Sequence, residues 1–307
     1  MKRPLVRAFV AGLAVTLVAA VAVEGLGAAG RSGPARAADV VEIHSAHGAS
    51  FVPALQGKRP LFILALGSDA RPGQNITGQR SDSIHIIGVD LKRQRATILG
   101  FPRDSWVHIP GHGTTKINTA MVFGGPGLMV KTIESITGIR IDFWMLTSFQ
   151  GLKRMVNGIG GLRVYVPRSM HDRFSGANFS KGVHRFDGAR ALAFARDRHD
   201  VPGGDFGRSG NQGRLMLAAL TQLHKVFDQN PGKLFEWIAV GWRSFRTDLS
   251  LGTLLDLALT ATSVPSKNVK NLVVPGTTGS AGGASVVFIS SSAKAIYADM
   301  RADGVVG

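Results

Sequence analysis

The chain has 307 residues, of which 44% are hydrophobic and only 18% are charged, so global disorder is excluded and one large domain or two small ones can form. A formal net charge of +16 indicates an anionic partner: nucleic acid, anionic lipid or a phosphorylated substrate. The lack of cysteine excludes thiol catalysis, thiolate metal sites and disulfide bonds.

Residues 1–30 have the pattern of a membrane segment. Three basic residues precede an uncharged apolar run over residues 8–23. This pattern is typical of a secretory signal peptide or a single membrane anchor, and the basic flank predicts that the rest of the chain lies outside the cytoplasm. An Ala-Arg-Ala sequence at 35–37 offers a cleavage site. The expected location is therefore the cell membrane, single-pass, or the secreted fraction if the segment is cleaved.

The remaining chain reads as a linker followed by one domain. Residues 31–58 are rich in Gly, Pro, Ala and Ser, which predicts a linker, and one globular domain is expected over 59–307. Strands are predicted at the apolar runs 60–67, 83–91, 95–101, 141–147, 162–167, 270–274 and 285–290. Helices are predicted at 125–138, 148–161, 186–196, 210–227, 249–262 and 291–303. Because strands and helices interleave, we expect an α/β fold, with a central mixed β-sheet flanked by helices on both faces and an N-terminal membrane helix.

Two acidic and two basic residues surround the loop between the first two predicted strands. Asp69 and Arg71 follow the first strand, and Arg80 and Asp82 precede the second. Carboxylates are the protein ligands that Mg²⁺ typically takes, and arginines bind phosphate oxygens in bidentate pairs. We therefore expect Asp69 and Asp82 to bind Mg²⁺ or Mn²⁺, with Arg71 and Arg80 near phosphate or orienting the carboxylates. His85, on an apolar strand, is expected to be a hydrogen-bonded core residue.

Five further polar clusters lie at the ends of predicted elements or in loops, where open α/β sheets bind ligands. The clusters are centred on Arg103 and Asp104, on Lys116 and Asn118, on Arg196 and Arg198, on Asp205 and Arg208, and on Asn211 and Gln212. A single such pair is more often a surface ion pair, a cap or a turn than a ligand site. Their joint occurrence favours a pyrophosphate site, since pyrophosphate needs several positive charges.

Helix geometry refines two of these clusters. A helix that starts with Asp205 as its cap places Arg208, Asn211 and Gln212 on one face, beside the partial positive charge of the helix N-terminus. The second cluster behaves differently, because Arg196 and the arginine two residues later diverge in a continuous helix. Those two arginines share a face only if the helix ends between them.

These motifs, taken in order, resemble the LytR–CpsA–Psr family. The resemblance covers roughly residues 60–227 and is carried by "LGSDAR", "RSDSIHIIGVD", "ILGFPRDSWVHIPG", "TKINTAMVFGGP", "FQGLKRMVNGIGGLRVYVP" and "GVHRFDGARALAFARDRHDVPGGDFGRSGNQ". It implies an Mg²⁺-dependent phosphotransferase that moves a glycopolymer from a polyprenyl-pyrophosphate carrier at the cytoplasmic membrane to peptidoglycan, through a phosphodiester link. It also implies an apolar tunnel, lined by helices, for the lipid chain.

The resemblance carries over to individual residues. Asp69 and Asp82 match the family's Mg²⁺ ligands. The family's pyrophosphate-binding and catalytic positions are matched by Arg80, Arg103, Arg196, Arg198, Arg208 and Gln212. Asp104 matches the acid after the catalytic arginine, and the family's Lys-x-Asn motif is matched by Lys116 and Asn118.

Three groups of site residues are thus expected. The catalytic group is Arg103, Asp104, Arg196 and Arg198. The pyrophosphate-binding group is Arg71, Arg80, Lys116, Asn118, Asp205, Arg208, Asn211 and Gln212. The metal ligands are Asp69 and Asp82. The arginines would stabilise the charge of the transition state, and either Asp104 or a metal-lowered pKa of the acceptor hydroxyl would serve proton removal.

Two positions depart from the family pattern. Asn211 stands where the family often has Arg, which leaves one phosphate-binding charge fewer. Asn157 stands where Asp is frequent, and that side chain is expected to be structural.

Two alternatives to the transferase remain open from the sequence. With water as acceptor, the same site would hydrolyse polyprenyl pyrophosphate. A non-catalytic protein that binds anionic polymers is the second alternative. Nucleic acid is not the expected partner, because the N-terminal segment would place the basic domain away from DNA. The glycopolymer itself is not identified by the residues.

Overall fold

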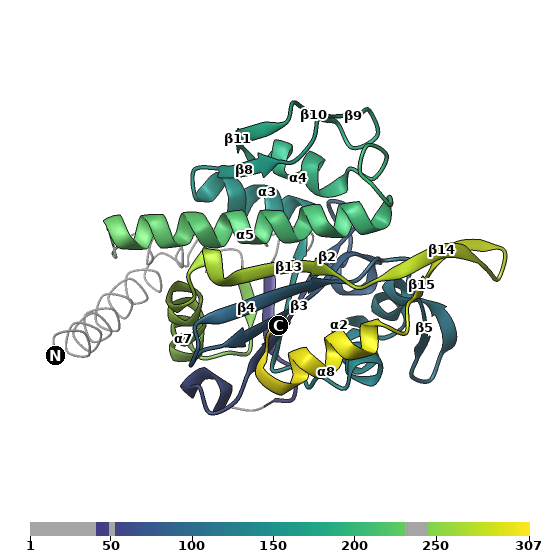
Figure 1. Ribbon diagram of the computed structural model, residues 1–307, viewed down its shortest axis with the longest axis horizontal. Helices are drawn as coiled ribbons and strands as arrows, with labels where there is room; N and C mark the ends of the chain where they lie inside the picture. Colours follow the sequence, from purple (N-terminus) through teal and green to yellow (C-terminus); the bar gives the residue numbers. More distant parts are fainter. Residues whose placement is uncertain (1–40, 49–52, 231, 233–244) are drawn as a thin grey trace.

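A seven-stranded mixed sheet forms the centre of the computed structural model, which describes residues 41–48, 53–230, 232 and 245–307. The strand order is β12-β1-β7-β2-β3-β4-β13. The strands are β1 (Val41–Ser45), β2 (Leu61–Ser68), β3 (Ser81–Asp90), β4 (Arg95–Gly100), β7 (Phe143–Ser148), β12 (Phe245–Thr247) and β13 (Val269–Val273). The pairs β12–β1, β7–β2 and β4–β13 are parallel and the others antiparallel, so the expected mixed sheet is confirmed (Figure 1).

Helices cover both faces of this sheet, as expected (Figure 1). One face packs against α2 (Ala120–Thr137) and α8 (Ala293–Asp303), and the other against α5 (Asp205–Gln229) and α7 (Leu251–Ser263). The alternation of β3 explains this division: Ile84 and Ile86 enter the core beneath α2 and α8, while His85 faces α5. A Cβ at Gly100 would collide with His85 and Ser209, so this glycine permits the close approach of α5 to the sheet.

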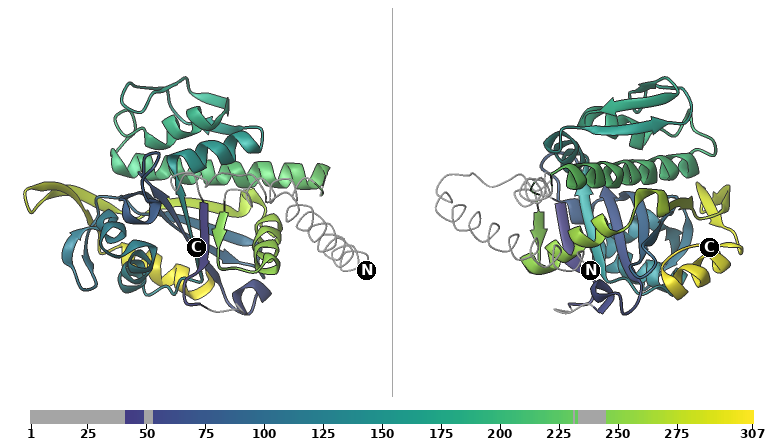
Figure 2. Two further views of the ribbon diagram at one scale, coloured as in Figure 1. Left: turned by 180° about the vertical axis from the view of Figure 1, so that it is seen from behind. Right: turned by 60° about the vertical axis from the view of Figure 1, so that its left-hand side comes forward.

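A smaller lobe lies on the far side of α5 from the sheet (Figures 1 and 2). It contains α3 (Phe149–Gly158), β8 (Leu162–Val166), β9 (Met170–Asp172), β10 (Ala177–Phe179), β11 (Gly182–Phe186) and α4 (Gly188–Arg196). Phe179, Phe186 and Phe194 form its core together with Leu215 of α5. The strand predicted at 162–167 therefore forms, but it pairs with β11 and does not join the central sheet.

Two hairpins extend beyond one end of the central sheet, on the right in Figure 1. They are formed by β5 (Trp106–Ile109) with β6 (Gly113–Lys116) and by β14 (Gly276–Ala281) with β15 (Ala284–Ile289). A bridge between Ser105 and Val287 joins them. Short 3-10 turns occur at Pro53–Gln56 (η2), Ile76–Gly78 (η3), Ile117–Thr119 (η4) and Ser266–Asn268 (η5).

The predicted helices are all present, but α2 begins five residues before the expected start at 125. The backbone breaks at Gly124 and Gly125, where Gly125 has a φ of 63°, and the helix continues through Pro126. The early turn was hidden by this Gly-Gly-Pro sequence, which normally marks a loop.

The prediction of a linker over residues 31–58 is wrong for its second half. Val41–Ser45 form β1, an internal strand between β7 and β12, and Ile43 is buried. The short apolar alternation of this strand was masked by the surrounding Gly, Ala and Ser. The predicted membrane helix over residues 1–30 lies outside the described residues. Within the part of the chain that the structure describes, no helix is long and apolar enough to span a membrane.

Candidate functional site

Asp69 and Asp82 lie at neighbouring ends of β2 and β3. The two strands are antiparallel, and the backbone N–H of Asp69 donates to the carbonyl oxygen of Arg80 over 3.0 Å, which closes the loop between them. Burial raises the pKa of Asp69, and the negative charge of Asp82 raises it further, against the opposing effects of Arg103 and Arg80. The two carboxylates predicted to act together are therefore close enough to interact electrostatically.

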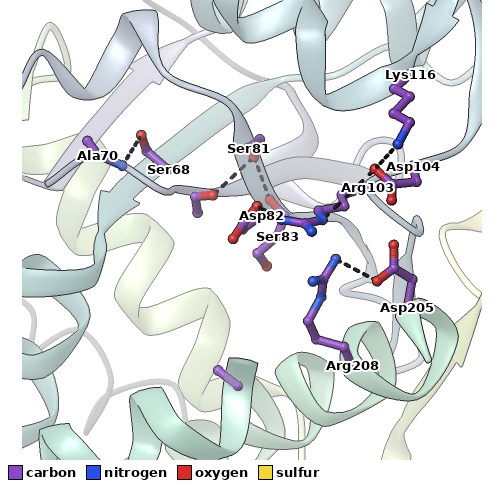
Figure 3. Close-up of polar contacts among 12 residues, drawn as sticks. Ser68, Ala70, Ser81, Asp82, Ser83, Arg103, Asp104, Lys116, Asp205 and Arg208 are labelled. Atoms are coloured by element: carbon purple, nitrogen blue, oxygen red, sulfur yellow. Dashed lines mark hydrogen bonds and ion pairs between the residues drawn. The ribbon is translucent and has the colours of Figure 1, made fainter. Parts of the chain in front are cut away.

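Arg103 stands at the centre of a chain of charges (Figure 3). Its Nη1 lies 2.6 Å from Oδ1 of Asp82, and its Nε lies 4.0 Å from Oδ1 of Asp104. Nζ of Lys116 lies 3.3 Å from the same Asp104 oxygen. Burial lowers the pKa of Arg103, but Asp82, Asp205 and Asp104 outweigh it and raise the pKa, so this guanidinium stays charged.

The segment with the Lys-x-Asn motif holds the loop that carries Arg103. The backbone N–H of Asn118 donates to the carbonyl oxygen of Arg103 over 3.2 Å, and that of Ile117 donates to Ser105 over 2.8 Å. The Asn118 side chain is buried, and its Oδ1 has no partner among the described residues. Asn118 thus lies beneath the loop, while Lys116 reaches Asp104.

The helix α5 starts at Asp205, one residue away from the expected cap position. Gly204 is the N-cap, with a φ of 56° that favours glycine, so the prediction that Asp205 caps the helix is wrong. Asp205 instead lies in the first turn, where Oδ1 is 3.1 Å from Nη2 of Arg208. Arg208 is only 5% exposed, and burial lowers its pKa. Burial and then Asp104 raise the pKa of Asp205, while Arg208 opposes the rise.

Gln212 joins the sheet to the lobe. Its Nε2 donates to the carbonyl oxygen of Asp82 over 3.0 Å and to that of Ala195 over 3.2 Å. This residue lies one turn after Arg208, so the two side chains follow each other on one face of α5, as expected.

The arginines at the end of α4 share a face. The helix ends at Arg196, and the next residue, Asp197, is extended with a ψ of 126°. Arg196 and Arg198 consequently both line the same cavity, which is the arrangement expected if the helix ends between them. Cζ of Arg196 lies 5.2 Å from the centre of the Phe149 ring, a cation–π contact with the residue that directly follows β7.

These side chains surround one end of a cavity of about 790 Å³ between the sheet, α5 and the lobe. The polar side chains at this end are Asp82, Arg103, Arg196, Arg198, Arg208 and Gln212. The apolar remainder of the lining includes Met145, Leu152, Met155, Val156, Ile159, Leu162, Leu192, Leu215, Met216 and Ala219. Such a cavity suits a ligand with an anionic head and a long apolar chain.

Comparison with known proteins shows the family of the chain. The model of the LytR_cpsA_psr family matches residues 31–301. The chain belongs to the LytR–CpsA–Psr family. It is 31% identical, over 207 residues and 67% of each chain, to the polyisoprenyl-teichoic acid–peptidoglycan teichoic acid transferase TagU of Enterococcus faecalis. It is 32% identical to the regulatory protein MsrR of Staphylococcus aureus, over 72% of this chain and 69% of MsrR.

A solved structure of the LytR–CpsA–Psr family has the same fold. The crystal structure of TagV from B. subtilis superposes with a TM-score of 0.68 at 27% identity, and the match covers 80% of this chain and 96% of TagV. The α/β fold with a central mixed sheet is therefore shared with a member of the family, and the resemblance inferred from the sequence motifs is confirmed.

Eight predicted site residues of this LytR–CpsA–Psr chain do not line the cavity. Six of them lie around the lining residues: Asp69, Arg80, Asp104, Lys116, Asn118 and Asp205, of which Arg80 is exposed beside Asp69. The other two are Arg71 and Asn211. Arg71 is exposed and lies outside the lining. Asn211 is only 1% exposed and lies outside it too, with Oδ1 accepting from Nη1 of Arg214 over 3.1 Å. The reason is helical geometry: Asn211 is about 60° from Arg208 and about 100° from Gln212, on the side away from the cavity.

The remaining departure from the family pattern is structural, as expected. Oδ1 of Asn157 accepts from the backbone N–H of Gly188 over 2.7 Å, which joins α3 to the start of α4. Only an acceptor is needed for this bond, so Asn replaces Asp without loss of the contact.

Two parts of the site were missed from the sequence. Leu215, Met216 and Ala219 continue the face of Gln212 along α5, a spacing that was visible in the sequence. The turn between β9 and β10 and the adjacent His199 also border the cavity. Neither segment has the regular spacing of apolar residues from which helices and strands are predicted.

Proposed function

We propose that this chain transfers a glycopolymer from a polyprenyl-pyrophosphate carrier to peptidoglycan and forms a phosphodiester link. The observation that carries this proposal is the single cavity with arginines at one end and apolar side chains along the remainder. A polyprenyl pyrophosphate has the same two parts in the same order. The name of the relative TagU describes this kind of reaction for that protein.

The arginines would bind the pyrophosphate. Figure 3 shows Arg103 and Arg208 reaching the site from the loop after β4 and from α5. Burial lowers the pKa of Arg208, and the positive charge of Arg103 lowers it further. Asp82 pairs with Arg103 and Asp205 pairs with Arg208. Arg208 is the more buried of the two arginines, and a charge in a poorly hydrated place interacts strongly with an anionic ligand.

The reaction follows from the position of these groups. An acceptor hydroxyl attacks the phosphorus that bears the glycan, the bond from this phosphorus to the bridging oxygen breaks, and polyprenyl phosphate leaves. The arginines stabilise the negative charge that spreads over the phosphate oxygens. The hydroxyl proton passes to the Asp104–Asp205 pair, since burial and the neighbouring Asp104 raise the pKa of Asp205.

The carboxylates Asp69 and Asp82 would hold Mg²⁺ or Mn²⁺. Their donor set fits: both ligands are hard oxygen donors at one loop, and Oδ2 of Asp82 is not the oxygen that Arg103 holds. Among the described residues no cluster of three or more His, Asp or Glu could hold a metal ion, so phosphate and water would have to supply the further ligands of Mg²⁺. When bound, the cation would offset charge on the pyrophosphate.

The location of the reaction follows from the N-terminal residues. We place residues 1–30 in the cytoplasmic membrane, with the catalytic domain outside the cytoplasm, as the basic flank of the apolar run indicates. The carrier lipid would then reach the cavity from the membrane surface.

The test is a transfer assay with the full-length protein. The protein is incubated with a polyprenyl-pyrophosphate-linked glycan, Mg²⁺ and a peptidoglycan oligomer, and the products are read by mass spectrometry. We expect a phosphodiester-linked conjugate and polyprenyl phosphate. Glycan phosphate released equally without the oligomer would identify a hydrolase instead, and binding without turnover would identify a non-catalytic protein.

A further inference from the structure

The turn between β9 and β10 forms an open rim of the cavity. Asp172, Phe174 and Ser175 of this turn line the cavity together with His199, which follows Arg198. Phe174 is 65% exposed, whereas the apolar residues deep in the cavity, such as Leu162, are buried. The cavity lining thus includes a solvent-exposed aromatic ring that is linked, through Asp172 and His199, to the segment that carries Arg198.

This rim is held in place by one buried carboxylate. Oδ1 of Asp172 accepts from the backbone N–H of Phe174 over 2.9 Å and lies 3.1 Å from Nδ1 of His199. The carbonyl oxygen of Asp172 also accepts from the N–H of Gly176 over 2.9 Å. Burial raises the pKa of Asp172, but the hydrogen bonds from Phe174 and His199 outweigh it and lower the pKa to about 2. Asp172 is therefore ionised and fixes both neighbours.

The Phe174 ring contacts two neighbouring side chains. Its centre lies 4.9 Å from that of the His199 ring at an interplanar angle of 45°, and Cζ of Arg173 lies 5.0 Å from it. A single exposed aromatic residue is ordinary on a protein surface. Phe174 differs because it lines the same cavity as Arg196 and Arg198 and is fixed by the contacts with His199 and Arg173.

We propose that Phe174, supported by His199 and Arg173, is the stacking platform for the sugar ring that is attached to the pyrophosphate of the donor. This inference rests on the proposed function. With the lipid in the apolar interior and the pyrophosphate on the arginines, the first sugar must lie on the open side, where Phe174 is. The C–H groups on one face of a sugar ring carry partial positive charge and attract the negative face of an aromatic ring. The sugar hydroxyls stay in water.

The experiment compares two probes on the full-length protein with Mg²⁺ present. One is a polyprenyl pyrophosphate without sugar, and the other carries a single N-acetylglucosamine. For Phe174→Ala we expect the Kd of the sugar-bearing probe to rise about 3- to 10-fold, the usual size of an aromatic contact, with the Kd of the sugar-free probe unchanged. Phe174→Trp should restore tight binding. Phe123→Ala is the matched control, because Phe123 is 47% exposed and stacks on His112 outside the cavity lining.

The outcomes separate the platform from the proposed function. Equal weakening of both probes by Phe174→Ala would mean that the ring contacts lipid or phosphate, and no weakening would mean that it contacts nothing; either result overturns the platform alone. Wild-type protein that binds neither probe would overturn the proposed function and the platform with it. Asp172→Asn, which loosens the rim, should weaken only the sugar-bearing probe, because Asp172 is a positioning residue.

Discussion

Nη1 of Arg103 lies 2.6 Å from Oδ1 of Asp82, so the loop after β4 is joined to the start of β3 by an ion pair at the mouth of the cavity. The guanidinium keeps its other N–H donors for a ligand, since only one nitrogen is bound to the carboxylate. Asp82 therefore fixes the orientation of the Arg103 guanidinium and balances its charge, and in the proposed reaction this orientation directs Arg103 toward a phosphate.

This orientation predicts that Arg103→Lys is not a conservative change. Lysine keeps the charge but cannot contact Asp82 and a phosphate at once with a planar group. We expect kcat/KM for the lipid-linked donor to fall about 10- to 100-fold, the size of one lost charge-assisted hydrogen bond. Arg93→Lys is the control, because Arg93 pairs with Asp90 and Asp303 at an exposed position. Wild-type turnover in Arg103→Lys would remove Arg103 from the reaction.

The cation can be tested without an activity assay. Mg²⁺ or Mn²⁺ should raise the Tm of the wild-type protein, on the order of 5 °C at saturating concentration, because a ligand that binds only the folded state stabilises it. Asp69→Asn should remove this increase. Asp90→Asn, a change in a carboxylate that pairs with Arg93 at the other end of β3, should retain it. An equal cation response in wild type and Asp69→Asn would refute the proposed ligand.

The sequence was sufficient to predict most of the central sheet and part of the site. Apolar runs located five of the seven strands of the central sheet, all except β1 and the three-residue β12. The antiparallel turn between β2 and β3 was enough to bring Asp69 and Asp82 together. Three features needed the structure. The strand β1 is short and lies in a Gly- and Ala-rich segment, and the side chain of Asn211 leaves the cavity face by a rotation of about 60°. The third is Phe174, whose position depends on a turn without periodicity.

The buried position of Asn211 predicts that the arginine often found here in the family would destabilise this protein and would not increase its activity. Asn211→Arg should lower the free energy of unfolding by about 1–3 kcal/mol, because it buries a further positive charge next to Arg214 and Arg208. Turnover should not rise. Thr221→Arg, on the exposed side of the same helix, should leave urea unfolding almost unchanged. A faster Asn211→Arg enzyme of normal stability would show that the side chain faces the phosphate after all.

His85 predicts a specific dependence of stability on pH. The side chain of His85 is fully buried. Its Nδ1 is hydrogen-bonded to the Ser83 hydroxyl and its Nε2 to the Ser209 carbonyl oxygen. Burial lowers its pKa from 6.5 to about 4. A depressed pKa means that the neutral form is the one bound in the folded protein, so its stabilisation is complete above pH 6.5 and is lost as the pH falls toward 4. The loss should reach about 3 kcal/mol.

Urea unfolding between pH 7 and pH 4 measures this effect. His85→Gln retains a donor for the Ser209 carbonyl and has no titrating group, so its free energy of unfolding should fall less with pH than that of the wild type. Parallel curves for the two proteins would show that His85 does not titrate in this range.

The central claim, that one cavity binds both the pyrophosphate and the lipid, is tested most directly by filling only its apolar part. Ala219 lines the cavity three turns along α5 from Arg208, and Thr221 lies on the exposed side of the same helix. We predict that Ala219→Trp lowers kcat/KM at least about tenfold for a donor with a long polyprenyl chain, as expected when a bulky ring displaces buried apolar contacts, yet leaves a two-isoprene donor nearly unaffected. Thr221→Trp should change neither. Equal activity of Ala219→Trp and wild type on the long-chain donor, or an equal loss on both donors, would contradict the claim.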